Sequence, residues 1–68
     1  MYNKNMKTEN REKFLKIYAN LPMAVREEII ITLDDGKTIS WNAAFFEVEN
    51  QTPLGEIILE KLEKVKII

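Results

Sequence analysis

The chain has 68 residues, of which 46% are hydrophobic and 31% charged, and its net charge is −1. A chain of this length forms one small domain that buries only ~60% of the surface exposed in its unfolded form. Cysteine and histidine are absent from the sequence, which excludes disulfides, thiolate nucleophiles and a Cys/His zinc site. Because the core is thin and these cross-links are excluded, we expect a second copy to add stability, as in a homodimer.

The N-terminal residues differ from the rest of the chain. Residues 1–8 are polar and show no periodicity, so we expect a flexible N-terminal arm followed by a single domain over residues 9–68. The arm contains no apolar stretch like that of a secretory signal, and no apolar run approaches the ~18 residues of a membrane span. We therefore expect a cytoplasmic protein that does not contact a membrane.

The first regular element is expected to be a helix that starts near residue 9 and ends at Pro22. Thr8 or Asn10 can cap its beginning. Spacings of i, i+3, i+4 and i+7 place four residues on one apolar stripe: Phe14, Ile17, Tyr18 and Leu21. Proline disfavours helical geometry at the residue before it, so residues 22–26 are expected to form a short turn that redirects the chain.

Residues 28–33 give the clearest strand signal, because they form a short run rich in β-branched residues. Asp35 and Gly36 follow, and this pair supplies the positive-φ geometry of a tight hairpin turn. We therefore expect residues 37–41 to return antiparallel, with Ile29 and Ile31 on one face. Both faces of this hairpin are partly apolar. A lone hairpin is unstable in water, so helices or another chain must cover it.

Residues 42–50 fit two structures. Helical spacing and a capping Ser40 favour a short helix, whereas the aromatic and β-branched residues also suit an extension of the second strand. The residues that would form the helical stripe are Trp41, Ala44, Phe45 and Val48. Both readings stay open at the level of the sequence.

The last element is expected to be a helix that begins at Pro53, with Thr52 as its cap. The expected apolar face of this helix consists of Leu54, Ile57, Ile58, Leu62 and Val65. The sequence thus predicts an α+β domain with an N-terminal helix, a tight β-hairpin, a short helix or strand extension, and a C-terminal helix.

Several short motifs resemble a group of small archaeal proteins. They are Leu21-Pro22, Arg26-Glu27-Glu28-Ile29, Asp35-Gly36, Ser40-Trp41-Asn42, and Thr52 to Gly55 leading into Ile58-Leu59. The resemblance would extend from about residue 14 to residue 68, and it implies no activity. A bias towards Ile, Lys and Glu is compatible with a thermophilic source.

Several acidic residues and one glycine are candidates for a cation, catalytic or phosphate site. Asp34 and Asp35 could help to bind a hard cation, but turn chemistry alone explains them. Paired carboxylates need a cleft for acid–base catalysis, and so small a domain has little room for one. Gly55 near a helix N-terminus could hold a phosphate, but close packing of that helix against the hairpin explains it better. We therefore expect no enzymatic activity, no metal, no cofactor and no small-molecule substrate.

Two groups of side chains are candidates for contact with a macromolecule. Trp41, Phe45 and Phe46 cannot all lie on one buried face in either reading of residues 42–50, so some aromatic surface should mark a protein interface. The other group is basic and could contact nucleic acid: Lys4, Lys7, Arg11, Lys13 and Lys16.

The sequence therefore favours a small non-enzymatic protein–protein interaction or regulatory module, either homodimeric or the light subunit of a larger partner. The alternative is a nucleic-acid-associated regulator, such as an antitoxin-like protein, that uses the basic N-terminal helix. Retention on DNA or RNA that weakens steeply with salt separates the two hypotheses, because phosphate contacts release counterions.

Overall fold

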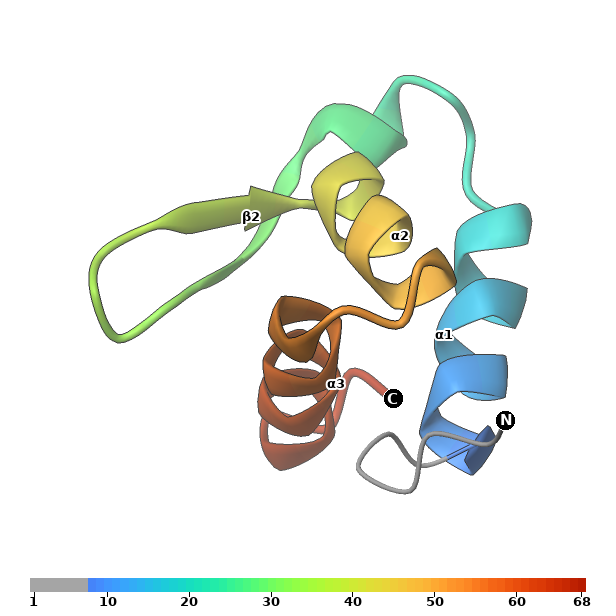
Figure 1. The fold of residues 1–68 in the computed structure, drawn as a ribbon. Helices are drawn as coiled ribbons and strands as arrows, with labels where there is room; N and C mark the ends of the chain where they lie inside the picture. Colours follow the sequence, from blue (N-terminus) through green and yellow to red (C-terminus); the bar gives the residue numbers. More distant parts are fainter. Residues whose placement is uncertain (1–7) are drawn as a thin grey trace.

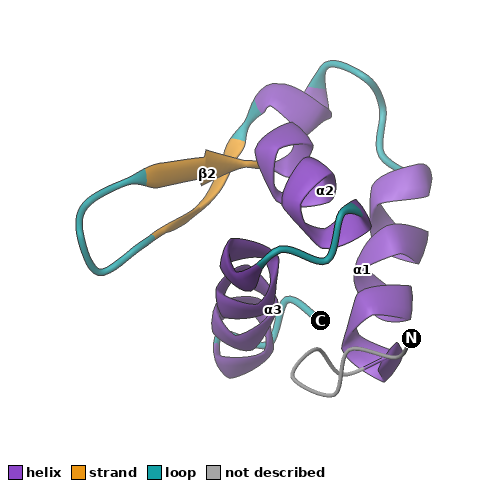
Figure 2. Ribbon diagram, in the orientation of Figure 1, coloured by secondary structure: helices purple, strands orange, loops and turns teal. Residues whose placement is uncertain are grey.

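The computed structural model describes residues 8–68 and confirms the α+β class. Three helices pack together, and a two-stranded antiparallel hairpin extends from one side of them (Figure 1). Figure 2 shows the same view coloured by secondary structure. In chain order the elements are α1 (Thr8–Ala19), η1 (Val25–Glu27), β1 (Ile29–Thr32), β2 (Thr38–Ser40), α2 (Trp41–Glu49) and α3 (Pro53–Lys64).

The first helix follows the expectation except at its two ends, because it stops at Ala19 and leaves Leu21 of the expected stripe beyond it. Thr8, which we assigned to the N-terminal arm, is already the first residue of α1, and the remaining arm residues 1–7 lie outside the described part of the chain. Phe14, on the expected stripe, is fully buried. The expected turn after Pro22 is confirmed, because the N–H of Val25 donates to the Pro22 carbonyl at 3.0 Å as the chain enters η1.

The hairpin pairs β1 with β2 in the expected antiparallel order. Ile31 lies opposite Ile39, and both are buried. A register irregularity between Ile29 and Ile31 interrupts the alternation of faces, so Ile29 is 55% exposed rather than sharing the buried face with Ile31. The return strand also ends one residue earlier than expected, at Ser40.

The ambiguous segment is helical up to Glu49, with Asn50 as the C-cap, and the strand extension is wrong. The Ser40 hydroxyl accepts a hydrogen bond from the Ala43 N–H at 3.1 Å, which caps α2 as the sequence indicated. Ala44 and Val48, both on the expected helical stripe, are fully buried. This segment forms a helix and not a strand because helical spacing places both side chains in the core, one turn apart.

The connection between α2 and α3 is short and closely packed. Thr52 caps α3 by accepting the Gly55 N–H at 2.9 Å, and its hydroxyl donates to the Glu47 carboxylate at 2.5 Å. Pro53 occupies the first position of α3, as expected. A Cβ added to Gly55 would lie 2.6 Å from the Glu47 carbonyl oxygen. Gly55 therefore allows α3 to approach α2, and not the hairpin as the sequence suggested.

One hydrophobic core joins the three helices and the hairpin. Phe14 enters from α1, and Ile58 and Leu62 enter from α3, all without exposed surface. The buried apolar residues of the described chain are Phe14, Ile31, Leu33, Ile39, Ala44, Val48, Ile58, Leu59 and Leu62. Since α3 supplies three of them, its position determines how the hairpin and the other helices meet.

The close approach at Gly55 predicts a large effect for Gly55→Ala. The added methyl group would collide with the backbone of α2, and such overpacking costs ~2–3 kcal/mol, which lowers the melting temperature of a domain this size by roughly 10–20 °C. Thermal unfolding followed by circular dichroism measures the change. A helical Gly→Ala change without a collision stabilises by about 1 kcal/mol, so a higher melting temperature would contradict the contact.

Gly36 is required for a different reason. Its φ is +89°, and a Cβ built there would meet no atom within 4 Å. Gly36→Ala should therefore cost only the backbone strain, about 1 kcal/mol. Gly36→Asn should cost less than Gly36→Ala, because asparagine adopts positive φ more readily. Equal melting temperatures for all three proteins would contradict this explanation of the turn.

Candidate functional site

The three aromatic residues proposed as an interface do not form one surface. Trp41 and Phe45 are half-buried and pack against the core, and the Trp41 ring stacks on Phe14 with centroids 5.8 Å apart. Phe46, on the outer side of α2, is 63% exposed. Of the three, only Phe46 presents most of its surface to solvent.

Tyr18 connects α1 to α2 and to η1. Its ring stacks on Phe45 at 4.2 Å with the planes 9° apart, and the Arg26 guanidinium lies 4.4 Å from its centroid. The Tyr18 hydroxyl donates to the Asn42 side-chain oxygen at 2.6 Å. The stack of Arg26, Tyr18 and Phe45 therefore holds three elements together, which gives Phe45 a structural role.

The basic residues of α1 are partly engaged within the chain. Arg11 forms an ion pair with Glu49 at 3.6 Å, and Lys13 forms one with Glu9 at 3.7 Å. Lys16 is exposed on the same helix. The remaining two predicted nucleic-acid contacts, Lys4 and Lys7, lie outside the described residues.

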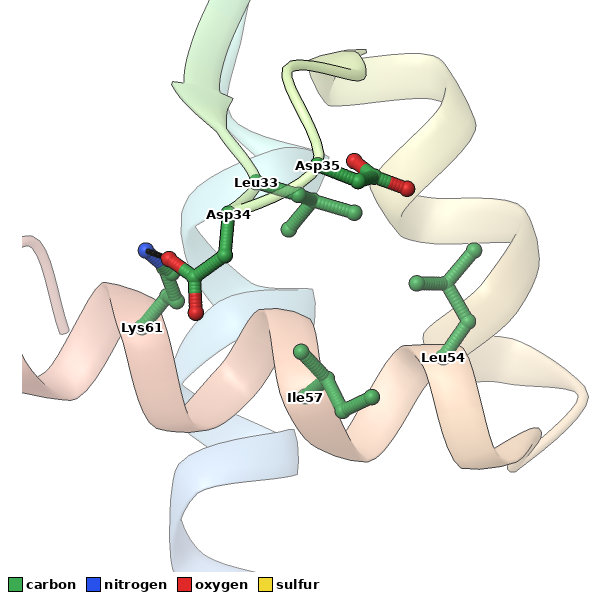
Figure 3. A pocket seen from close by; sticks show the side chains of 6 residues that line it. All are labelled: Leu33, Asp34, Asp35, Leu54, Ile57 and Lys61. Carbon is green, nitrogen blue, oxygen red and sulfur yellow. Dashed lines mark hydrogen bonds and ion pairs between the residues drawn. The ribbon is translucent and has the colours of Figure 1, made fainter.

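A groove lies between the hairpin turn and α3, and Figure 3 shows its lining. Its volume is about 290 Å³. The lining residues come from two segments that are far apart in the sequence: Leu33, Asp34 and Asp35 from the hairpin, and Leu54, Ile57 and Lys61 from α3. We call it the hairpin–α3 groove.

The walls of the hairpin–α3 groove are apolar, and its rim is charged. Leu33 belongs to the core, Leu54 is half-buried, and Ile57 is 49% exposed. On the rim, the Lys61 ammonium group donates to the Asp34 carboxylate at 2.7 Å, which links the hairpin turn to α3. The exposed Asp35 adds a second carboxylate to this rim.

Electrostatics in the groove depends on Lys61. The hydrogen bond from Lys61 and the positive charge of that group lower the pKa of Asp34 below its ordinary value of 3.8, and the charge of Lys64 adds a smaller effect in the same direction. Asp34 is fully exposed, so solvent screens these interactions. The carboxylate is therefore ionised, and paired with Lys61, at neutral pH.

Both turn carboxylates have local structural partners. Besides the Asp34–Lys61 pair, Asp35 accepts the Lys37 N–H at 2.9 Å and so closes the turn on itself. Within residues 8–68, no cluster of three or more acidic, cysteine or histidine side chains is arranged to hold a metal ion. The arrangement can receive an apolar side chain, and its charged rim can orient the approach of that side chain.

Length and apolar character decide whether a helix can span a membrane. None of those in residues 8–68 has the length and apolar character needed to cross a membrane. The cytoplasmic location stays a prediction.

Comparison with known proteins gives no relative: no protein-family model, no curated protein and no solved structure matches the chain. The resemblance to small archaeal proteins, and the thermophilic source, therefore stay predictions.

The sequence indicated the lining of the groove only in part. The predicted apolar face of the last helix includes Ile58 and Leu62, which are fully buried in the structure, as well as Leu54, Ile57 and Val65. Ile57 and Val65 lie outside the core, at 49% and 58% exposure. The sequence shows that the last helix has more apolar residues on one side than a single core contact can bury. It does not show which of these residues stay exposed.

The contact between Lys61 and Asp34 predicts a specific titration. The pKa of Asp34 should lie below 3.8 in the wild-type protein and return towards 3.8 in Lys61→Met, as measured by NMR titration of the side-chain carboxyl carbon. Because folding lowers this pKa, the ion pair stabilises the fold above the unfolded-state pKa, and its contribution is lost as the pH falls through the folded-state pKa.

The control variant Lys64→Met should change the pKa of Asp34 less than Lys61→Met does. The same pKa in wild type and Lys61→Met would show that the pair does not form.

Proposed function

We propose that this protein is a non-enzymatic protein–protein interaction module, and that the hairpin–α3 groove receives an apolar side chain of its partner. The observation that carries the proposal is the half-exposed Ile57 in an apolar groove of about 290 Å³ with a charged rim. Protein interfaces combine apolar contacts at their centre with a polar rim, and the groove has both features at the scale of a single side chain.

The local chemistry supports binding rather than catalysis. Asp34 is paired with Lys61, and Asp35 accepts a backbone N–H of its own turn, so both carboxylates already serve the fold. A general acid or base must instead come within hydrogen-bond reach of a substrate atom. The open groove with apolar walls at Leu54 and Ile57 offers contact area instead.

Contacts on α1 make the nucleic-acid alternative weaker. Arg11 and Lys13 each lie within ion-pair distance of a glutamate, which reduces the positive charge available to phosphates. We therefore expect no salt-dependent retention on DNA or RNA. Retention that falls steeply between about 50 and 200 mM salt would favour the nucleic-acid hypothesis instead.

Site-specific photo-crosslinking tests the proposed groove. A benzoylphenylalanine at position 57 should form adducts with a protein partner in extract of the source organism. The same amino acid at position 46 is the matched control, because Phe46 is also an exposed apolar side chain of a helix but does not line the groove. Adducts at position 57 alone would support the proposal. Equal adducts at the two positions, or none at position 57, would contradict it.

A further inference from the structure

The C-terminal end of α3 carries a second exposed apolar feature. Val65 is 58% exposed and Ile67 is 38% exposed, and the exposed Lys64 and Lys66 are interleaved with them. Lys66 has a φ of +63°, and the Ile67 N–H donates to the Leu62 carbonyl at 2.9 Å, so the chain turns at a defined point after the helix. We call residues 64–67 the C-terminal knob.

The groove and the knob are complementary in polarity and in charge. The groove has apolar walls and the two carboxylates of Asp34 and Asp35 on its rim, whereas the knob has two apolar side chains and two ammonium groups. Lys61 neutralises part of the rim through Asp34, but no ion pair or hydrogen bond to a cation is found for Asp35 within residues 8–68. A basic, apolar segment therefore fits the groove better than an acidic one.

Resting on the function proposed above, we infer that the partner is a second copy of this chain, whose C-terminal knob occupies the hairpin–α3 groove. The apolar wall of the groove, at Leu54 and Ile57, lies in the first half of α3, whereas the knob begins at the last residue of that helix. When two copies of α3 run antiparallel about a two-fold axis, each groove faces the knob of the other copy. The interface is then isologous and closes at two subunits.

The charges along α3 favour the same arrangement. An axis near residue 62 brings Glu60 of one copy level with Lys64 of the other, because both lie within α3 and are equally distant from the axis along the helix. Glu60 and Lys64 are both exposed, and neither has an ion-pair partner within residues 8–68. The charge of Lys64 also acts on Asp34 of its own chain, but without forming an ion pair with it, so Glu60 and Lys64 can pair across the axis, twice per dimer.

Sedimentation equilibrium from about 10 µM to 1 mM tests this inference, because it measures the masses of the wild type and of variants with reversed charges. The wild type should sediment as a dimer at the upper concentrations. Asp34→Lys alone and Lys66→Glu alone should each raise the dissociation constant by about tenfold or more, since each places like charges in both contacts of its own dimer. An equimolar mixture of the two variants should form a heterodimer more tightly than either variant forms a homodimer, because opposite charges then meet in both contacts.

Apolar variants supply a matched comparison. Ile57→Glu in the groove and Ile67→Glu in the knob should each give a monomer, whereas Phe46→Glu should leave the dimer intact. Circular dichroism melts establish that each variant is folded before its mass is measured. Dissociation by Phe46→Glu with retention by Ile57→Glu would overturn the assignment of the interface.

The remaining outcomes separate this inference from the proposed function. A monomeric wild type over the whole concentration range, or a mixture no tighter than its components, overturns the second copy as the occupant. If position 57 still forms adducts with a different protein, the groove keeps its proposed function and only its occupant changes. A monomer without adducts at position 57 overturns both. For the dimer, peptide mass mapping should locate the adducts on residues 64–67.

Discussion

The close approach of α3 to the last turn of α2 fixes how the other elements pack. At Gly55, an added Cβ would lie 2.6 Å from the Glu47 carbonyl oxygen, so only a residue without a side chain permits this spacing. Thr52 reinforces the corner because its hydroxyl joins both helices through hydrogen bonds. With the corner fixed, Ile58 and Leu62 reach the centre of the core, where they pack with the residues of α1 and the hairpin.

The same placement of α3 creates the groove. Once Ile58 and Leu62 face the core, the neighbouring flank of the helix, with Ile57 and Lys61, is turned towards the hairpin turn. Lys61 reaches Asp34 across this space, while Ile57 remains half-exposed because no side chain of the described residues fills the gap. Packing of the core and formation of the groove are therefore two consequences of one helix position.

The distribution of polar and apolar groups supports interaction rather than catalysis. The conspicuous polar clusters serve the fold: Asp35 closes the hairpin turn, and Arg26 lies on the Tyr18 ring between η1 and α1. Exposed apolar side chains, by contrast, remain along α3 and just after it, with Ile57 in the groove and Val65 in the knob. Since water solvates such side chains poorly, their burial against a partner is favourable.

Features that depend on neighbours along the chain could be predicted from the amino-acid sequence alone. Ser40 and Thr52 each cap a helix, and Gly36 supplies a positive φ, because these are properties of a few adjacent residues. The contact of Gly55 with α2 and the position of Ile57 in a groove, outside the core, become visible only in the folded chain. Periodicity identifies the apolar side of a helix, but the partner of each residue on that side depends on segments distant in sequence, whose relative positions no local pattern encodes.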